Sequence, residues 1–293
     1  MNQTNKPPMM DTTWPSPVVE QDGDSVILSF DELSLQSRMR LDDPGALDLD
    51  YSRVMMAFLL LLPQPQSILM IGLGGGSLAK YCHRHLPQAR ITVVEINPEV
   101  IAARETFQIP QDDERFSVVF GDGAEFLAHT PRGSHDVILV DGFGIHGEQP
   151  EALCSLPFYK SCRAALRESG VLMVNLQDQE PQCSRLIGRI WQMFGESVVP
   201  LEVACGGNLV VLASDEASFQ ACAGQVRRRC RDLAADHQVV LGDVLEGLEE
   251  ELKPWRVAAE RPKKPVASTL GVREGAVKPK KVAGKRKSGG GKP

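Results

Sequence analysis

SILMIGLGGGS, residues 67 to 77, is an apolar run that breaks into glycines just before a helical pattern begins. A parallel strand followed by such a loop can bring backbone N–H groups against a nucleotide. The loop glycines in this interpretation are Gly72, Gly74 and Gly76. Tight strand-to-helix turns also use glycine for steric reasons, so the loop alone does not establish a ligand site.

Acidic residues end the next two apolar runs. Glu95 ends ITVVE and lies where a carboxylate can accept both hydroxyl groups of a ribose. Asp122, which is followed by Gly123, is placed to accept the exocyclic amine of adenine. Asp122 also suits the N-cap of a helix that begins at Ala124, and one carboxylate can serve both purposes. The glycine loop, Glu95 and Asp122 follow three consecutive strands, and together they predict an adenosine site.

Apolar runs and helical patterns alternate through the middle of the chain. The runs are continuously apolar, which is typical of parallel strands covered by helices on both faces. The strands are expected at residues 68–72, 90–95, 116–120, 136–141 and 171–175. The helices are expected near residues 76–86, 98–106, 123–129, 156–167 and 182–194.

The pattern changes in the last part of the sheet. Runs 197–204 and 208–213 are joined by three residues, which are too few for a crossover helix, so they should form an antiparallel hairpin. Parallel strands that end in such a hairpin predict an α/β, Rossmann-like fold of the S-adenosylmethionine-dependent transferase type. The six-strand parallel layout of nicotinamide dehydrogenases does not fit.

The chain divides into three predicted parts. Residues 1–48 hold an N-terminal extension and a small antiparallel β element with a turn at Asp22-Gly23. Residues 49–252 form the Rossmann-like nucleoside-binding domain, and residues 253–293 form a tail. The domain should open with a helix over 49–62 and close with a helix from 216 to about 236 and a short one ending near 252.

The tail is strongly basic, with 13 Lys and Arg against two Glu, whereas residues 1–252 hold 19 basic and 36 acidic side chains. It is rich in Pro, Gly, Ala and Lys and has almost no large apolar residues after Trp255, so it should be disordered. The alternative is a polycation that contacts nucleic acid or the acidic body.

The composition of the chain bears on where in the cell the protein is located. The apolar fraction of 42% is that of an ordinary globular core, and the longest apolar segment, 54–62, is too short to span a bilayer. Residues 1–20 hold prolines and acids where a signal peptide needs an apolar stretch. The seven cysteines include no C-x-x-C pair, so we expect reduced thiols, no metal site and a soluble, cytoplasmic protein without membrane contact.

Asp141 ends the run DVILVD at the carboxyl end of the fourth strand. This end lies next to the glycine loop, at the edge where α/β sheets place their reactive groups. The alternative is that Asp141 braces the loop that follows. His146 in that loop is able to titrate near neutrality, although a single loop histidine is more often merely solvated.

These motifs resemble the spermidine synthase (polyamine aminopropyltransferase) family, from about residue 31 to 214 and best over 68–175. VEINPEVIAAR is similar to the family's ribose segment, GDGAEFL to its adenine segment and HDVILVDGFG to its active-site strand. LCSLPFYKSCRAALRESGVLMVN is similar to the helix and strand that follow. Gln36, Tyr51 and Tyr159 fall where the family carries comparable residues.

The resemblance implies transfer of an aminopropyl group from decarboxylated S-adenosylmethionine to an amine acceptor, with release of methylthioadenosine. Asp141 would then be the base or its first relay, and Gln36, Tyr51 and Tyr159 would contact the substrates. The resemblance implies no metal, and members of the family commonly form homodimers.

Three positions depart from the family pattern. Gly75 and Gly144 stand where the family has aspartates that meet amines, and Arg53 stands where it has a glutamate. Because a buried cation requires paired charges, diamine binding would depend on replacement carboxylates. The candidates from nearby loops are Glu148, Glu151 and Asp178.

Gly75 also leaves two alternatives open. An aspartate there would repel the carboxylate of intact S-adenosylmethionine, and a glycine removes that discrimination. An S-adenosylmethionine-dependent methyltransferase is therefore the first alternative. The second is a non-catalytic protein that binds an adenosine ligand and whose basic tail recruits nucleic acid.

Overall fold

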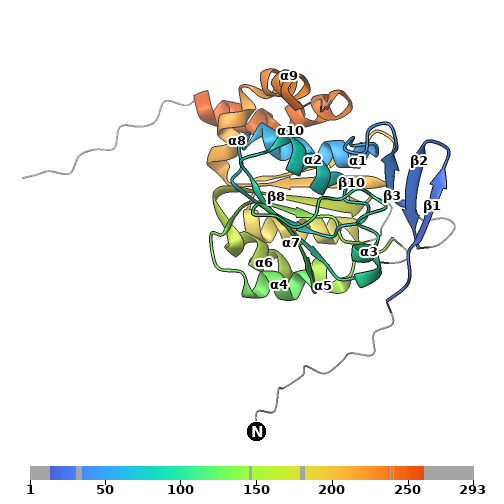
Figure 1. Cartoon of the computed structure of the whole chain (residues 1–293). Helices are drawn as coiled ribbons and strands as arrows, with labels where there is room; N and C mark the ends of the chain where they lie inside the picture. Colours follow the sequence, from blue (N-terminus) through green and yellow to red (C-terminus); the bar gives the residue numbers. More distant parts are fainter. Residues whose placement is uncertain are drawn as a thin grey trace, which may run out of the picture. The chain divides into compact units, whose positions relative to one another are not determined.

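The computed structural model describes residues 14–30, 35–144, 147–178, 182–237, 239 and 241–260, except for the side chains of 243 and 256–260. Within this part the main sheet has seven strands, and its β10 and β9 form the predicted antiparallel hairpin (Figure 1). In spatial order they are β6 (Phe116–Phe120), β5 (Arg90–Glu95), β4 (Ser67–Ile71), β7 (His135–Val140), β8 (Leu166–Gln177), β10 (Asn208–Ala213) and β9 (Val198–Glu202).

The sheet is parallel from β6 to β8 and antiparallel beyond it. β10 pairs with both β8 and β9, so the second strand of the hairpin lies inside the sheet and the first lies at its edge. This layout confirms the predicted Rossmann-like transferase fold. The order of β4, β5 and β7 brings the carboxyl ends of these three strands together, which is where the predicted loop glycines and acids lie.

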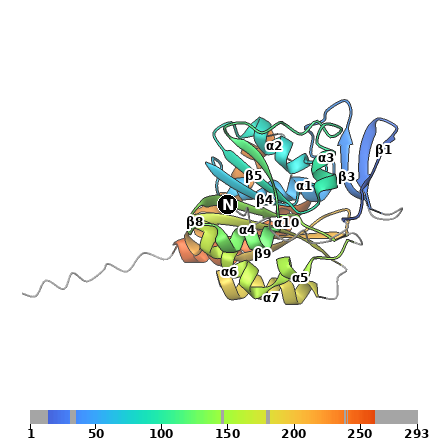
Figure 2. The same ribbon diagram turned by 60° about the horizontal axis from the view of Figure 1, so that its bottom comes forward.

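Helices cover both faces of the main sheet (Figures 1 and 2). One face carries α4 (Gly123–His129), α5 (Glu151–Cys154), α6 (Leu156–Ala165) and α7 (Cys183–Phe194). The other carries α1 (Asp50–Met55), the 3-10 helix η1 (Met56–Leu60), α2 (Ser77–His85), α3 (Pro98–Ala102), α8 (Glu216–Ala223), α9 (Val226–His237) and α10 (Gly242–Glu260). Successive strand residues alternate between the two cores, so each continuous apolar run serves both faces.

A second, three-stranded sheet contains β1 (Val18–Asp22), β2 (Ser25–Ser29) and β3 (Leu35–Arg40), which are paired antiparallel in that order. It is the small β element that the sequence predicts. Its turn holds Gly23 at a φ of 56°, a conformation that glycine adopts easily. Leu28 and Met39 are buried in the same core as α1 and α2, which fixes β3 beside the main sheet.

Several predicted helix boundaries are wrong. The helix expected over 49–62 is a short α1 followed by η1, whose residues are all buried. The helix expected over 216–236 is broken into α8 and α9 near Gly224. The last helix runs on to Glu260, past the predicted start of the tail, because Trp255 packs against Phe219 with ring centroids 5.6 Å apart.

The predicted disorder of the tail falls on residues 261–293, which lie outside the described part of the chain. His146 also lies outside it. Among the helices that the structure describes, none has the length and apolar character needed to cross a membrane.

Candidate active site

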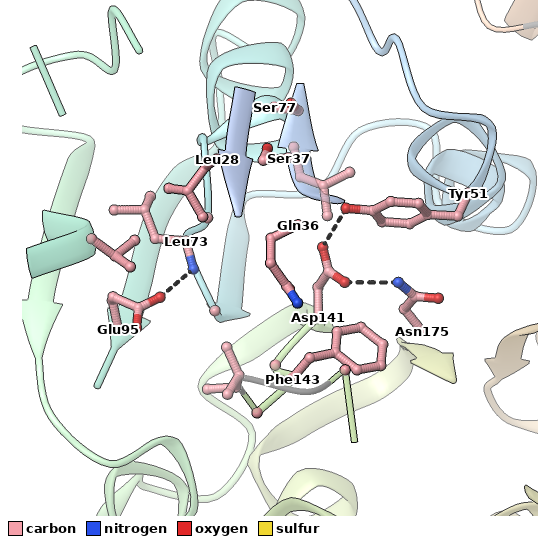
Figure 3. A pocket seen from close by; sticks show the side chains of 18 of the residues that line it. Leu28, Gln36, Ser37, Tyr51, Leu73, Ser77, Glu95, Asp141, Phe143 and Asn175 are labelled. Atoms are coloured by element: carbon pink, nitrogen blue, oxygen red, sulfur yellow. Dashed lines mark hydrogen bonds between the residues drawn. The ribbon is translucent and has the colours of Figure 1, made fainter. Parts of the chain in front are cut away.

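A cavity of about 900 Å³ opens at the carboxyl ends of β4, β5, β6 and β7 (Figure 3). Residues of β3, α1 and the turn between β9 and β10 complete its wall. Its size is in the range of small-molecule sites. Most of the predicted site residues line it: Gln36, Tyr51, Gly72, Gly74, Glu95, Asp122, Gly123 and Asp141.

Gly76 and Tyr159, which the sequence also placed in the site, are not among the residues that line this cavity. Gly76 is the N-cap of α2 at a φ of 68°, and a Cβ there would lie 2.6 Å from Ile109 Cδ1. Tyr159 is fully buried under the opposite face of the sheet, and its hydroxyl has no hydrogen-bond partner in the described part of the chain. Both residues therefore have packing roles in this structure.

Gly72 allows the ends of β4 and β7 to meet. Its φ is 98°, and a Cβ added to it would collide with the carbonyl oxygen of Asp141. The two strand ends are also joined by the Asp141 N–H, which donates to the Ile71 carbonyl oxygen over 2.9 Å. A glycine is therefore required at this position for the strands to approach one another.

Glu95 holds the glycine loop in place (Figure 3). Its carboxylate accepts hydrogen bonds from the backbone N–H groups of Leu73 and Asn97, each over 2.8 Å. Burial raises the pKa of Glu95, while these backbone donors act to lower it. A carboxylate has more lone pairs than the two used here, so Glu95 can also accept from a ligand in the cavity.

Asp122 is the N-cap of α4, as predicted. Its Oδ1 accepts from the backbone N–H groups of Ala124 and Glu125 over 2.7 and 3.0 Å. Both bonds use one oxygen, so the cap does not occupy Oδ2, and Asp122 lines the cavity. Gly123 is buried against Ile71, and a Cβ there would collide with that side chain.

Asp141 is held by two side chains from distant parts of the chain (Figure 3). The Tyr51 hydroxyl donates to its Oδ2 over 3.2 Å, and the Asn175 amide donates to its Oδ1 over 2.8 Å. Burial raises the pKa of Asp141 and these two donors act against that rise. Burial and the charge of Asp141 raise the pKa of Tyr51, so its hydroxyl stays protonated and remains a donor. The site thus holds a carboxylate with an increased affinity for protons.

Asn175 and Asn208 belong to the site but are not predicted from the sequence. Asn175 is fully buried in β8, and its Oδ1 accepts from the Asn208 amide of β10 over 3.0 Å. The signal that could have found Asn175 is one polar residue inside the apolar run GVLMVNL, because a buried amide requires partners. Asn208 carries no such signal, since it follows a glycine turn where polar residues are common.

The space beside Gly75 is already filled. A Cβ at this position would lie 2.6 Å from Ser37 Oγ and 2.8 Å from Phe107 Cδ1. A Cβ at Gly144 would likewise collide with the carboxylate of Glu148. At both positions where the family pattern has an aspartate, neighbouring side chains occupy the room that the aspartate would need.

Arg53 is directed away from the cavity and is not among its lining residues. Its guanidinium pairs with Asp50 and donates to the carbonyl oxygens of Leu47 and Asp48 over 2.7 and 3.1 Å. The expected charge reversal at this position therefore places no cation in the cavity.

The three candidate replacement carboxylates differ in position. The Glu148 carboxylate lies against Gly144, a residue of the cavity wall. Asp178 accepts from the Gly207 N–H over 3.0 Å and so braces the turn between β9 and β10. Glu151 is exposed in the first turn of α5 and is not among the residues that line the cavity.

Acidic residues predominate around the cavity. Among the described residues that line it, the only cationic side chain is Arg38, which pairs with Asp48. The lining carboxylates are Asp48, Asp50, Glu95, Asp122 and Asp141. A cavity of this composition favours a cationic ligand such as an ammonium or a sulfonium. No group of three or more metal-ligating side chains occurs in the part of the chain that the structure describes.

A Rossmann-like sheet that ends in an antiparallel hairpin, with an acidic cavity at its carboxyl edge, is the layout of the S-adenosylmethionine-dependent transferase fold. The model for the spermine/spermidine synthase domain matches residues 49–200. A protein of Neisseria meningitidis named polyamine aminopropyltransferase is 36% identical over 239 residues, which cover 80% of this chain and 90% of that protein. The chain therefore belongs to the spermine/spermidine synthase family.

Solved structures agree on the fold. A probable spermidine synthase from Corynebacterium glutamicum has a TM-score of 0.59 at 20% identity, covering 73% of this chain and 83% of that one. A spermidine synthase in complex with the transition-state analogue AdoDATO has a TM-score of 0.55 at 20% identity, covering 79% of this chain and 87% of that one.

Proposed function

We propose that the chain transfers an aminopropyl group from decarboxylated S-adenosylmethionine to an amine acceptor. Its membership in the spermine/spermidine synthase family supports this proposal, as does the name of the Neisseria relative, polyamine aminopropyltransferase. The observation that carries it is the half-buried Asp141, which is aligned by two donors in an acidic cavity at the switch point of the sheet.

The nucleoside half of the cavity consists of the glycine loop 72–76, Glu95 and Asp122. In the proposed complex Glu95 accepts the ribose hydroxyls, because its carboxylate already lies against the loop and faces the cavity. Asp122 accepts the adenine amine through the oxygen that the helix cap does not use. The glycines let the backbone lie close to the ligand.

The amine half consists of Asp141, Tyr51, Asn175, Asn208 and Gly144. The lone pair of the acceptor nitrogen attacks the aminopropyl carbon bonded to the sulfonium. The carbon–sulfur bond breaks, and its electron pair stays on sulfur, which leaves as part of neutral methylthioadenosine. The acceptor ammonium must lose a proton for its lone pair to react. Asp141 takes that proton, and the pKa rise that burial causes makes it a better base than an exposed aspartate.

Product analysis tests the proposal directly. The purified chain is incubated with decarboxylated S-adenosylmethionine and a diamine, and methylthioadenosine is measured together with the aminopropylated amine. Equal molar formation of both is expected. In Asp141→Asn, kcat should fall by about 10²- to 10⁴-fold while the nucleoside affinity is kept. An unchanged kcat in this variant would show that Asp141 is not the base.

Methyl transfer is the second candidate, and the filled space beside Gly75 favours it. Position 75 has no side-chain carboxylate that would repel the carboxylate of intact S-adenosylmethionine. Calorimetric titration with the decarboxylated and intact compounds separates the candidates. Tighter binding of the intact form, together with methylated rather than aminopropylated product, would replace the first candidate with the second.

Two further proposals concern partners. Family resemblance supports a homodimer, which light scattering of the purified protein measures. Residues 253–293 hold 13 basic and two acidic residues, and this positive charge supports contact of the tail with nucleic acid. Salt-sensitive retention of DNA or RNA should then be lost when residues 261–293, the part of the tail beyond α10, are deleted, and retention by the shortened protein would contradict this proposal.

A further inference from the structure

A chain of hydrogen-bonded side chains connects the β9–β10 hairpin to Asp141. The Asn208 amide donates to Asn175 Oδ1 over 3.0 Å, and the Asn175 amide donates to Asp141 Oδ1 over 2.8 Å. The register of β8 and β10 pairs Asn175 with Val210, so Asn208 is its diagonal neighbour on the same face. The hairpin thus reaches the candidate base through one intervening residue.

The Asn208 bond decides which way the Asn175 amide faces. Because Asn175 Oδ1 accepts from Asn208, its NH₂ group is directed at the carboxylate. If this amide turned over, its oxygen would face a carboxylate oxygen and the interaction would become repulsive. Asn175 is only 1% exposed, so bulk water is not available to replace a lost partner.

The backbone of Asn175 is also held. Its carbonyl oxygen accepts from the Gln149 amide over 2.5 Å, and Gln149 is buried in the segment that follows Asp141. Asn175 therefore joins three segments: β8 itself, the segment after β7 and the hairpin. The backbone of Asn175 is thus held by other contacts, and Asn208 controls the orientation of its side chain.

We infer that Asn208 is a positioning residue, which acts through the Asn175 amide to keep Asp141 oriented and ionised for proton transfer. The inference rests on the proposed role of Asp141 as the base. The hydrogen bond from Asn175 lowers the pKa of Asp141, in opposition to burial, so loss of the orienting bond should let that pKa rise. Asn208 itself has no hydrogen bond to Asp141 among the described contacts.

Other charged groups surround the same cavity and must be kept constant. Tyr51 of α1 donates to Asp141 directly and is the only titratable residue of the described part that does so. The other charged residues of the cavity wall are Arg38 of β3, Asp48 just before α1, Asp50 of α1, Glu95 of β5 and Asp122 before α4. None of these is altered in the variants below.

The first test measures the ionisation of Asp141 without reference to catalysis. Aspartate is labelled with ¹³C at its side-chain carboxyl, and the Asp141 signal is assigned by its absence from Asp141→Asn. In Asn208→Leu the midpoint of the Asp141 titration should move to higher pH. Asn208→Asp keeps the shape of the native side chain, offers only acceptors to Asn175 and adds a negative charge near the carboxylate, so it should move the midpoint further than Asn208→Leu does, in the same direction.

The control is Ser214→Ala. Ser214 is a buried residue next to the other end of β10, and its hydroxyl donates to the Gly170 carbonyl oxygen of β8 over 3.0 Å. Its removal deletes one hydrogen bond between the same two parts of the sheet, far along β8 from Asn175. The Asp141 midpoint should stay at the wild-type value, which separates positioning from general destabilisation.

The second test is the pH profile of kcat. In Asn208→Leu the acid limb should move to higher pH, with kcat on that limb falling about tenfold, the effect of one hydrogen bond to a charged group. An unchanged Asp141 midpoint in folded Asn208→Leu and Asn208→Asp would overturn the inference. If the wild-type chain transfers no aminopropyl group, the proposed function fails, but the carboxyl titration still decides whether Asn208 controls Asp141.

Discussion

The nucleoside half of the cavity and its amine half are held together by different kinds of contact. In the nucleoside half, Glu95 and Asp122 each accept hydrogen bonds from backbone N–H groups close to them in space. In the amine half, Asp141 depends on side chains from α1 and β8, and through β8 on β10. Backbone donors are present whatever the sequence, whereas each side-chain partner can be changed by one substitution.

This difference suggests why the family pattern is kept in one half and altered in the other. Glu95 and Asp122 stand in the expected segments, while the departures at positions 53, 75 and 144 concern the amines. The fold needs Glu95 to hold the glycine loop and Asp122 to cap α4. The glycines at 75 and 144 have no side chain to hold the fold, and Arg53 contacts the start of α1 instead of the cavity. The following substitutions test this contrast.

Gly72→Ala should have the largest effect, because Gly72 lies where the two halves meet. Its methyl group would collide with the Asp141 carbonyl oxygen at a φ that alanine avoids. We expect a loss of about 3 kcal/mol or more in the free energy of unfolding and loss of nucleoside binding. Chemical denaturation and calorimetry measure the two effects.

The matched control is Gly188→Ala in α7. A Cβ at Gly188 has no atom within 4 Å, so this substitution should stabilise the helix by up to about 1 kcal/mol. Equal stability of the two alanine variants would contradict the steric argument for Gly72.

Glu95→Gln should weaken nucleoside binding selectively. The amide keeps the shape but loses the charge and one acceptor, so affinity for methylthioadenosine should fall by about 10- to 100-fold, as for a hydrogen bond to a charged group. Glu99→Gln, in the exposed first turn of α3, is the control and should bind as the wild type does. Calorimetry gives both dissociation constants. If Glu95→Gln bound methylthioadenosine as tightly as the wild type, Glu95 would brace the loop without contacting the ligand.

Asp141→Asn should increase stability with a defined pH dependence. The folded-state pKa of Asp141 is raised above its ordinary value of 3.8, so ionisation of this residue costs stability as pH rises through the raised pKa. Removal of the charge should therefore stabilise the fold at pH 8, and this gain should disappear below pH of about 4.

Thermal unfolding of the two proteins across this pH range measures the difference. The exposed Asp232→Asn in α9 serves as the control, and its effect should be small and independent of the cavity. A gain for Asp141→Asn that does not change with pH would contradict the linkage.

Tyr159→Phe should have the smallest effect and should leave the acceptor KM unchanged. The Tyr159 hydroxyl is buried without a partner in the described part of the chain and lies away from the cavity. Its removal should be neutral or stabilising by about 1 kcal/mol at most. Tyr51→Phe, which removes a donor to Asp141, should instead change the pH profile. A change in KM in Tyr159→Phe would restore the role predicted from sequence.

Sequence alone places several residues of the proposed nucleoside half at the cavity, because their signals are local. A strand that ends in glycine, an acid that ends the next strand and an acid that starts a helix are each defined by a few consecutive residues. Gly72, Glu95 and Asp122 were found in this way.

The rest depends on register and direction, which spacing does not determine. Asn175 and Asn208 meet because β10 lies between β8 and β9 in one register. Arg53 turns toward the start of α1 because an acid and two carbonyl oxygens are within its reach there. The pair Phe158-Tyr159 lies on the buried side of α6, so the resemblance at Tyr159 reflects packing against the sheet.

The filled spaces beside Gly75 and Gly144 have a consequence for how this chain can evolve. An aspartate at position 75 requires Ser37 and Phe107 to move, and one at 144 requires Glu148 to move. The Glu148 carboxylate is the end of a flexible side chain that can turn away, whereas Phe107 beside Gly75 is fully buried, so an aspartate at position 75 carries the larger steric cost. An aspartate at position 75 therefore needs a compensating change at Ser37 or Phe107 before it fits.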